Sequence, residues 1–434
     1  MDPKTRKIQF GIYPAALCFC GLLFVLALDD ASNCLSGLHT IIHAEGALIT
    51  DYIALAGPGA AFLNSALVTL SALLVFRLAK AELSGSHIFV LGLMSGFALF
   101  GKNIFNLWPF VLGSFLYARF KGEPFAKHCN MGLLSSCLGP IVSFLCWSGG
   151  PVQFLLGLAL GVVIGFVICP LSAATFQILQ GLNLYNGGFA CGLTAFLVVP
   201  ALTALGKVPT GGLWWCTEST HELTLFLGLL CTALLLLGSF WGGHTKENWS
   251  SLRALLCDPG RAPCDFLPSY GPGAVLLNMG LCGLIATGYI LLVGGDLCGP
   301  TVGSIFTIMG FAAYGKHPRN ILPVMGGIAL GARLLPGLSL TAPAVQMAAL
   351  LGTTLAPMAG TYGWWGGLLA GFLHICLVMR TGAPVNGLNL YNNGFSGGLV
   401  VLFLDPILRA VLPHTPKDEG APPASAPLNQ QEDL

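Results

Sequence analysis

Long apolar runs, separated by short polar stretches, make up most of the chain. Most of the runs approach the roughly 20 residues that an α-helix needs to cross a bilayer. The pattern therefore predicts an all-α integral membrane protein with many spans. In the first half the runs cover about residues 9–29, 58–79, 86–101, 103–120, 130–147, 152–170 and 182–205.

The chain contains one unit twice. The motif Gly-Pro-Gly-Ala-x-x-Leu-Asn at 57–64 returns at 271–278, an offset of 214, with six of eight residues identical. The motif Gly-Leu-Asn-Leu-Tyr-Asn-x-Gly-Phe at 181–189 returns at 387–395, an offset of 206. A single deletion of eight residues in the second copy accounts for the change in offset.

This duplication defines the predicted organisation. Repeat 1 covers 8–213 and repeat 2 covers 222–413. The last residues, 414–434, are rich in Pro, Ala and charged side chains, which predicts a disordered cytoplasmic tail.

The third and fourth apolar runs of each unit are short. They either cross the membrane separately or form one re-entrant hairpin, and both alternatives stay open at this point. The total is 10–14 apolar helical segments. Because each unit then crosses five or seven times, an odd number, consecutive copies face opposite ways and form inverted-topology repeats.

Charge supports the inversion. The loop at 30–57 holds three acidic residues and no Lys or Arg, whereas its counterpart at 243–270 holds Lys246, Arg253 and Arg261. Lys and Arg favour cytoplasmic loops, so the same loop has changed sides. The same rule predicts that both termini are cytoplasmic, and we expect the protein in the cell membrane.

Composition excludes several classes of protein. Of 434 residues only 9 % are charged, where soluble chains have about 25 %. The net charge of +1 offers no basic face for nucleic acid. Most of the 15 cysteines lie in apolar runs, which is typical of small buried side chains and not of a disulfide framework.

The second motif places several polar side chains at the start of a long apolar segment. Such groups are costly in a membrane unless they are hydrogen-bonded or face a polar cavity. They either cap and tie two helices or line a solute path, and we predict the path. The candidate residues are Asn183, Tyr185, Asn186, Asn389, Tyr391 and Asn392.

The corners between the short segments are the other candidate site. They carry Lys102 and Asn106 in the first copy, and Lys316 and Asn320 in the second. In a re-entrant hairpin each lysine lies at membrane depth, where a charge is usually functional and would attract an anion or a polar solute. If both segments cross, the corners are ordinary turns.

Catalytic and metal-binding motifs are missing from the sequence, so we expect neither an enzyme nor a cofactor. The expected partners are the lipid bilayer, a small polar solute and further copies of the chain in a homo-oligomer. Asn64 and Asn278, in the first motif, are interpreted as donors of hydrogen bonds between helices.

The segment 155–193, which ends in Gly-Leu-Asn-Leu-Tyr-Asn-Gly-Gly-Phe-x-x-Gly-Leu, resembles a segment of urea transporters. That resemblance implies two inverted five-helix halves around a narrow pore for a small neutral amide, usually in a trimer. The whole duplicated chain also resembles an uncharacterised bacterial family of duplicated membrane proteins, known only as a domain of unknown function.

These observations predict a channel or facilitated transporter for a small polar solute, similar to urea, with its path between the repeats. An ion-coupled transporter of small organic anions is the first alternative, favoured if both corner lysines are buried and face one cavity. A membrane scaffold that transports nothing is the second.

Overall fold

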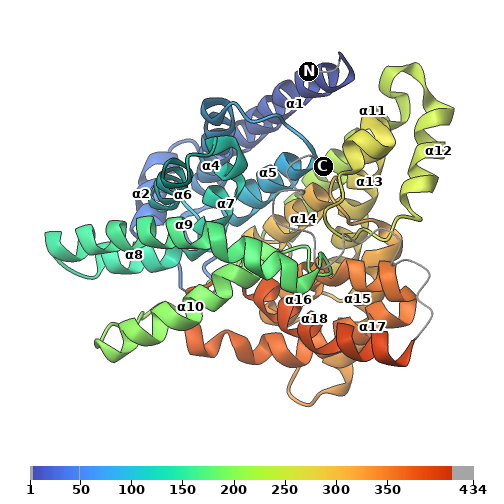
Figure 1. Cartoon of the computed structure of the whole chain (residues 1–434). Coiled ribbons are helices and arrows are strands. Elements are labelled where there is room, and N and C mark those ends of the chain that lie inside the picture. Colours follow the sequence, from blue (N-terminus) through green and yellow to red (C-terminus); the bar gives the residue numbers. More distant parts are fainter. Residues whose placement is uncertain (1–2, 48, 413–434) are drawn as a thin grey trace.

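The computed structural model describes residues 3–47 and 49–412, and the regular elements within these ranges are all helices (Figure 1). The all-α prediction is therefore confirmed for this part of the chain. Nine of the described helical segments are long and apolar enough to cross a membrane. The chain is thus a multi-pass membrane protein. The predicted tail at 414–434 lies outside the described residues.

Each apolar run predicted in the first half contains a helix. The helix that starts in the run at 152–170 continues through Pro170 as far as Leu179, because a membrane helix tolerates proline where neighbouring groups satisfy the freed carbonyl. The helices of the first half are α1 (Pro3–Ala27), α2 (Cys34–His43), α3 (Tyr52–Ala56), α4 (Pro58–Ala79), α5 (Gly85–Phe97), α6 (Trp108–Lys121), α7 (Cys129–Ser135), α8 (Gly139–Trp147), α9 (Pro151–Leu179) and α10 (Asn186–Ala204).

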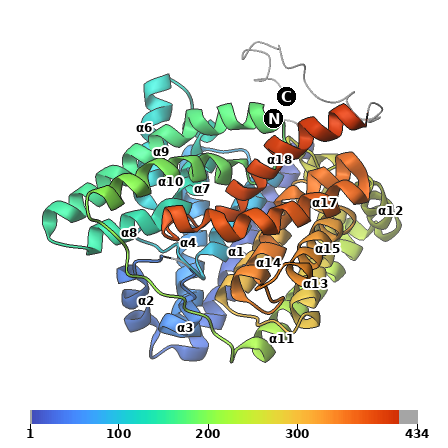
Figure 2. The ribbon, with the colours of Figure 1, turned by 90° about the horizontal axis from the view of Figure 1, so that it is seen from below.

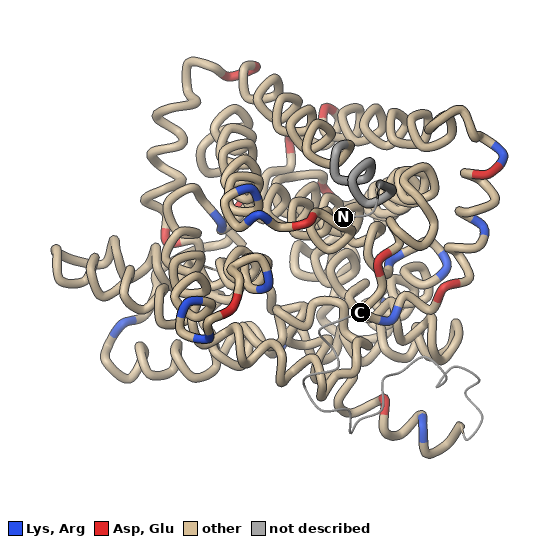
Figure 3. The backbone as a smooth tube through the Cα atoms, turned by 45° about the horizontal axis from the view of Figure 1, so that its top comes forward, with Lys and Arg blue, Asp and Glu red and all other residues tan. Residues whose placement is uncertain are grey.

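The second half repeats this order, and the backbone breaks at Gly271 inside α13 and at Gly363 inside α17. It contains α11 (Thr220–Phe240), α12 (Thr245–Leu255), α13 (Phe266–Leu292), α14 (Gly299–Phe311), α15 (Pro318–Leu334), α16 (Pro343–Leu351), α17 (Ala356–Thr381) and α18 (Asn392–Val411). The two halves lie side by side, blue to green and yellow to red (Figure 2). Charged residues gather mostly at turns and helix ends (Figure 3).

Contacts between the halves occur in reciprocal pairs. The Leu184 amide donates to the Thr354 carbonyl at 3.0 Å, and the Leu390 amide donates to the Cys137 carbonyl at 3.1 Å. Leu390 is Leu184 shifted by 206, but Thr354 is Cys137 shifted by 217. The interpretation as one deletion of eight residues was therefore wrong. The second copy is three residues longer before this segment and eleven shorter after it, since turns between helices tolerate length changes.

Two short helices, α5 and α14, cross at the centre of the interface between the halves. A Cβ atom added to Gly96 of α5 would lie 2.2 Å from the Gly303 carbonyl oxygen, and one added to Gly303 would lie 2.2 Å from that of Gly96. Only glycine allows two backbones to come this close. This crossing brings the end of each short helix next to the other half.

Candidate functional site

Each corner lysine contacts a motif tyrosine of the other half. The Lys102 Nζ atom donates to Tyr391 Oη at 2.8 Å, and the Lys316 Nζ atom donates to Tyr185 Oη at 2.6 Å. Both lysines are completely buried. The two candidate sites predicted from the sequence are therefore one site, in which the Lys–Tyr pairs cross between the halves.

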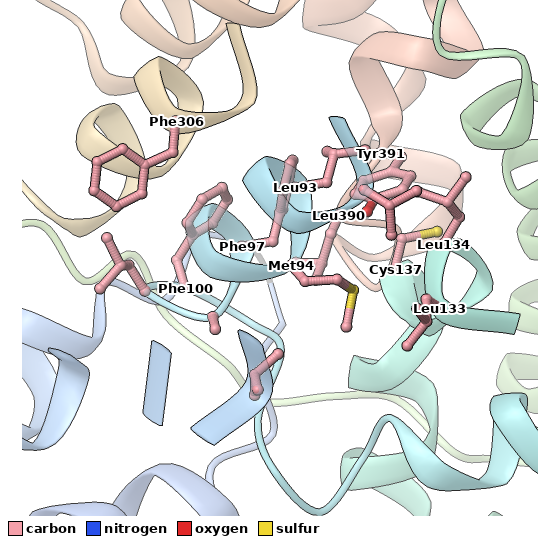
Figure 4. Close-up of a cluster of buried hydrophobic side chains, with 14 of the residues drawn as sticks. Leu93, Met94, Phe97, Phe100, Leu133, Leu134, Cys137, Phe306, Leu390 and Tyr391 are labelled. Atoms are coloured by element: carbon pink, nitrogen blue, oxygen red, sulfur yellow. The ribbon is translucent and has the colours of Figure 1, made fainter. Parts of the chain in front are cut away.

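The remaining lysine contacts differ between the copies. Lys102 Nζ also donates to the Leu133 carbonyl and contacts Met94 Sδ, each at 3.3 Å. Lys316 Nζ instead donates to Thr353 Oγ1 at 2.7 Å. Apolar side chains surround the first pair, where Tyr391 lies among Leu93, Met94, Phe97, Leu133, Leu134 and Cys137 (Figure 4).

Asparagines fix the shape of the corners. Asn64 Nδ2 donates to the Ala98 carbonyl at 2.7 Å and to the Lys102 carbonyl at 2.9 Å. Asn106 Nδ2 donates to the Gly101 carbonyl at 3.1 Å. Gly101 has φ +90°, a left-handed conformation that favours glycine. The corner thus holds the backbone of the lysine in a fixed position.

The second corner is built in the same way. Asn278 Nδ2 donates to the carbonyls of Ala312 at 2.8 Å and Lys316 at 2.7 Å, and Asn320 Nδ2 donates to the Gly315 carbonyl at 2.8 Å. The interpretation of Asn64 and Asn278 as links between helices is confirmed. Asn106 and Asn320 are buried in the corners, away from the cavity described next.

A cavity of about 330 Å³ lies between the halves. Tyr185 and Tyr391 line its deep end, and the partly exposed Ser86 and Asn130 lie at the other. Asp and Glu are absent from the described lining. Of the residues predicted to line a path, Asn183, Tyr185, Asn186 and Tyr391 do so. The other six, Lys102, Asn106, Lys316, Asn320, Asn389 and Asn392, do not line this cavity.

The exposed end of the cavity has no exposed equivalent in the second copy. Ser86 and Asn130 correspond in the second copy to Pro300 and Met347, at offsets of 214 and 217, and both of these are buried. The linker between the halves, a thin trace from α10 to α11 in Figure 2, passes the start of α14, because the Cys216 amide donates to Asp51, which also contacts Gly299. Its Trp215 indole donates to Asp296 Oδ2 at 2.9 Å.

The motif asparagines show the same asymmetry. Asn183 Nδ2 donates to the Gly394 carbonyl at 2.9 Å, and its Oδ1 accepts from the Tyr185 amide at 3.3 Å. Asn389 Oδ1 likewise accepts from the Tyr391 amide at 3.1 Å, but its buried Nδ2 has no partner among the described residues. The two copies thus differ in conformation at equivalent positions.

Two equivalent aspartates each contact the first residue of a short helix. Asp265 Oδ2 accepts from the Gly85 amide at 2.9 Å, at the start of α5. Asp51 contacts Gly299, at the start of α14, and accepts from the Cys216 amide of the linker at 2.9 Å. Desolvation raises the pKa of Asp51 to about 6 and also raises the pKa of Asp265.

Sequence reasoning missed Ser86, Asn130 and Thr353. The equivalent of Thr353 is Ser136, and both hydroxyls donate to the carbonyl three residues earlier. An alignment of the two copies that matches Pro140 with Pro357, at an offset of 217, would have shown that Ser136 and Thr353 are equivalent. Within the described residues, no cluster of three His, Cys, Asp or Glu side chains could hold a metal ion.

Comparison with known proteins places the chain in a family. Searches of curated proteins and of solved structures gave no match, so the resemblance to urea transporters gains no support. The DUF1576 family, described as a protein of unknown function, matches residues 30–204 and again 244–410. The two matches agree with the internal duplication, and together they cover most of the sequence. The chain therefore belongs to the DUF1576 family.

Proposed function

We propose that this protein is not an enzyme but a transporter, and that it moves a small polar solute across the membrane along the interface of its two halves. The observation that carries the proposal is the cavity that leads from one face to Tyr185 and Tyr391. A buried polar centre at the end of a cavity, inside an otherwise apolar helical protein, is the usual form of a solute site.

We further propose that the halves are inverted repeats. Asp265 immediately precedes α13, while Asp51 contacts Gly299, which follows the other end of α13. The backbone of α13 breaks at Gly271, and its continuous part, 272–292, is about 32 Å long, enough to span a bilayer. The equivalent aspartates would then lie at opposite membrane surfaces, as inversion requires.

Re-entrant hairpins fit the lengths of the short helices. Both α5 and α14 have 13 residues, or about 20 Å, which is less than the roughly 30 Å of the hydrocarbon core. After α6 the chain is back beside the start of α5, since Asn130 Nδ2 donates to Ser86 Oγ at 3.4 Å. Each hairpin would therefore place its lysine near the middle of the membrane.

Inverted repeats in unequal conformations support alternating access. In this proposal the described conformation opens beside Ser86 and Asn130. In the opposite conformation the contact between Trp215 of the linker and Asp296 would break. Pro300 and Met347 would then be exposed, as Ser86 and Asn130 are here. The basic loops near the open end, with Lys80 and Lys127, suggest that this end is cytoplasmic.

Uptake by proteoliposomes tests the function. The panel contains urea, acetamide, ammonium, acetate and lactate, each with and without a proton or sodium gradient. We expect flux of at least one solute, and Tyr185→Phe and Tyr391→Phe should each reduce it about tenfold or more. Tyr289→Phe is the matched control, because the Tyr289 hydroxyl is buried without a described partner. Absence of flux across the panel would favour a scaffold.

Labelling from each side tests the topology. Cysteines replace Lys80 and Lys207, in a background where the exposed Cys18 and Cys257 are serine. Inverted repeats predict that these two positions react with an impermeant reagent from opposite sides of the membrane. Reaction of both positions from the same side would contradict the inversion.

A further inference from the structure

We infer that the transported solute is a small organic carboxylate, bound at the deep end of the cavity by Tyr185 and Tyr391. This inference rests on the proposed transport function and specifies its substrate. Its first support is the charge of the centre. The partners of Lys102 and Lys316 in the described chain are a thioether, a main-chain carbonyl and hydroxyl groups, and none is a carboxylate.

Two buried lysines without a carboxylate partner are costly as cations, so an anion in the cavity would stabilise their charged form. A charge at membrane depth costs at least about 2.5–3.5 kcal/mol on insertion scales, and low polarity strengthens its attraction for an opposite charge. The ammonium groups lie over the rings of their tyrosines, at 4.8 Å for Lys102 and 4.4 Å for Lys316. Their field therefore reaches the cavity through the phenols that line it.

The phenols themselves are arranged as donors. Each tyrosine oxygen accepts a hydrogen bond from its lysine, so its own proton is left to donate elsewhere. Both tyrosines lie at the closed end of the cavity, where a carboxylate could accept both protons. Hydrogen bonds from charge-polarised donors to an anion are among the strongest in proteins.

Helix ends add donors of the same kind. Helix α10 begins at Asn186 and α18 at Asn392, directly after the two tyrosines. Gly187, Gly188 and Gly394, in the first turns of these helices, line the cavity. First-turn amides lack the usual partner four residues earlier, and the helix dipole attracts negative charge there. The Gly394 amide already donates to the Tyr391 carbonyl at 2.9 Å, so the candidate donors are the amides of Gly187 and Gly188.

The rest of the lining favours an organic anion with a polar substituent. Apolar groups such as Phe89, Met131 and Phe176 line the wall. The Oδ1 atoms of Asn130 and Asn186 are buried without a described partner, and Asn186 Nδ2 donates to the Ser172 carbonyl at 2.9 Å. These acceptors suit a hydroxyl or amine next to the carboxylate.

The test compares carboxylates with their neutral amides in proteoliposomes of the full chain. The pairs are acetate with acetamide and lactate with lactamide, measured at equal concentration. We expect at least tenfold faster uptake of the carboxylates, with lactate preferred to acetate, and acceleration by an inside-positive potential set with valinomycin and potassium. Chloride flux without carboxylate flux would overturn the inference.

Variants connect this preference to the lysines. Lys102→Gln and Lys316→Gln should each reduce lactate uptake at least tenfold while lactamide uptake changes less than twofold. Lys102→Arg and Lys316→Arg, which keep the charge, should retain more carboxylate uptake than the Gln variants. If a Gln variant does not fold, the Arg variant and Tyr391→Phe provide the comparison. Equal losses for lactate and lactamide would overturn the inference.

The outcomes separate the two proposals. Flux of acetamide or urea without flux of any carboxylate would leave the transport function standing and overturn the substrate class. Lack of flux for every solute would contradict the transport function itself. Binding is measured separately, as a shift in the unfolding temperature of the purified protein with lactate and with lactamide.

Discussion

The Nζ atom of Lys102 lies 2.8 Å from the Oη atom of Tyr391, although the two residues are 289 positions apart. The same relationship joins Lys316 to Tyr185 at 2.6 Å, across 131 positions. Each half therefore supplies the cation for one pair and the phenol for the other. Neither half can form a Lys–Tyr pair alone. A substitution in one half should therefore change the stability of the pair that it shares with the other half.

The crossed pairs predict a specific energetic coupling. Tyr391→Phe leaves the Lys102 ammonium with one acceptor fewer, which costs about 1.5–3 kcal/mol in the free energy of unfolding. In a double-mutant cycle, Lys102→Met and Tyr391→Phe should couple by at least about 1 kcal/mol. Unfolding in mixed micelles measures this. The control cycle of Lys102→Met with Tyr185→Phe should show much weaker coupling, and equal coupling would contradict the crossed arrangement.

The corner asparagines should be essential for stability. Asn64→Ala removes the donor to the Ala98 and Lys102 carbonyls, at about 1–3 kcal/mol for each carbonyl left unpaired. Asn278→Ala should have a similar effect in the other half. Thermal unfolding of the purified protein measures both. Ser36→Ala, which removes an exposed hydroxyl, should change little. If the Asn64→Ala variant is as stable as the parent, the hydrogen bonds of Asn64 do not stabilise the corner.

The crossing of the short helices should not tolerate a methyl group. Gly96→Ala places a Cβ atom 2.2 Å from the Gly303 carbonyl oxygen, so α5 and α14 must separate. Overpacking of this kind costs about 1–3 kcal/mol. Gly228→Ala is the control, since a Cβ there meets nothing within 4 Å. The unfolding temperature should fall only for Gly96→Ala.

Asp51 should make stability depend on pH. Its pKa of about 6 in the folded protein is above the usual value near 3.8, so the folded state binds the proton more tightly. The resulting stabilisation is complete below about pH 3.8 and disappears as the pH rises to about 6. Two pKa units correspond to about 3 kcal/mol. Unfolding between pH 4 and 8 should show this slope, and Asp51→Asn should flatten it.

Sequence reasoning found the tyrosines and lysines because both motifs occur twice. It placed the helices well, since a run of about 20 apolar residues has few alternatives to a helix in lipid. It did not assign Thr353, because a length change in a turn shifts the offset to its equivalent Ser136 from 214 to 217. Nor could it separate Asn106, which holds a corner, from Asn186, which lines the cavity, because both are polar residues in apolar surroundings.

The sequence by itself determined the membrane class, the duplication and the short list of polar residues, because hydropathy and internal identity are properties of the chain. Only the tertiary structure decided which of these residues meet. Lys102 pairs with Tyr391 and not with Tyr185 because α5 and α14 cross at Gly96 and Gly303, which carries each corner into the opposite half. The one-sided cavity was also beyond the sequence, because equivalent positions in the two copies have similar surroundings along the chain but are packed differently in space.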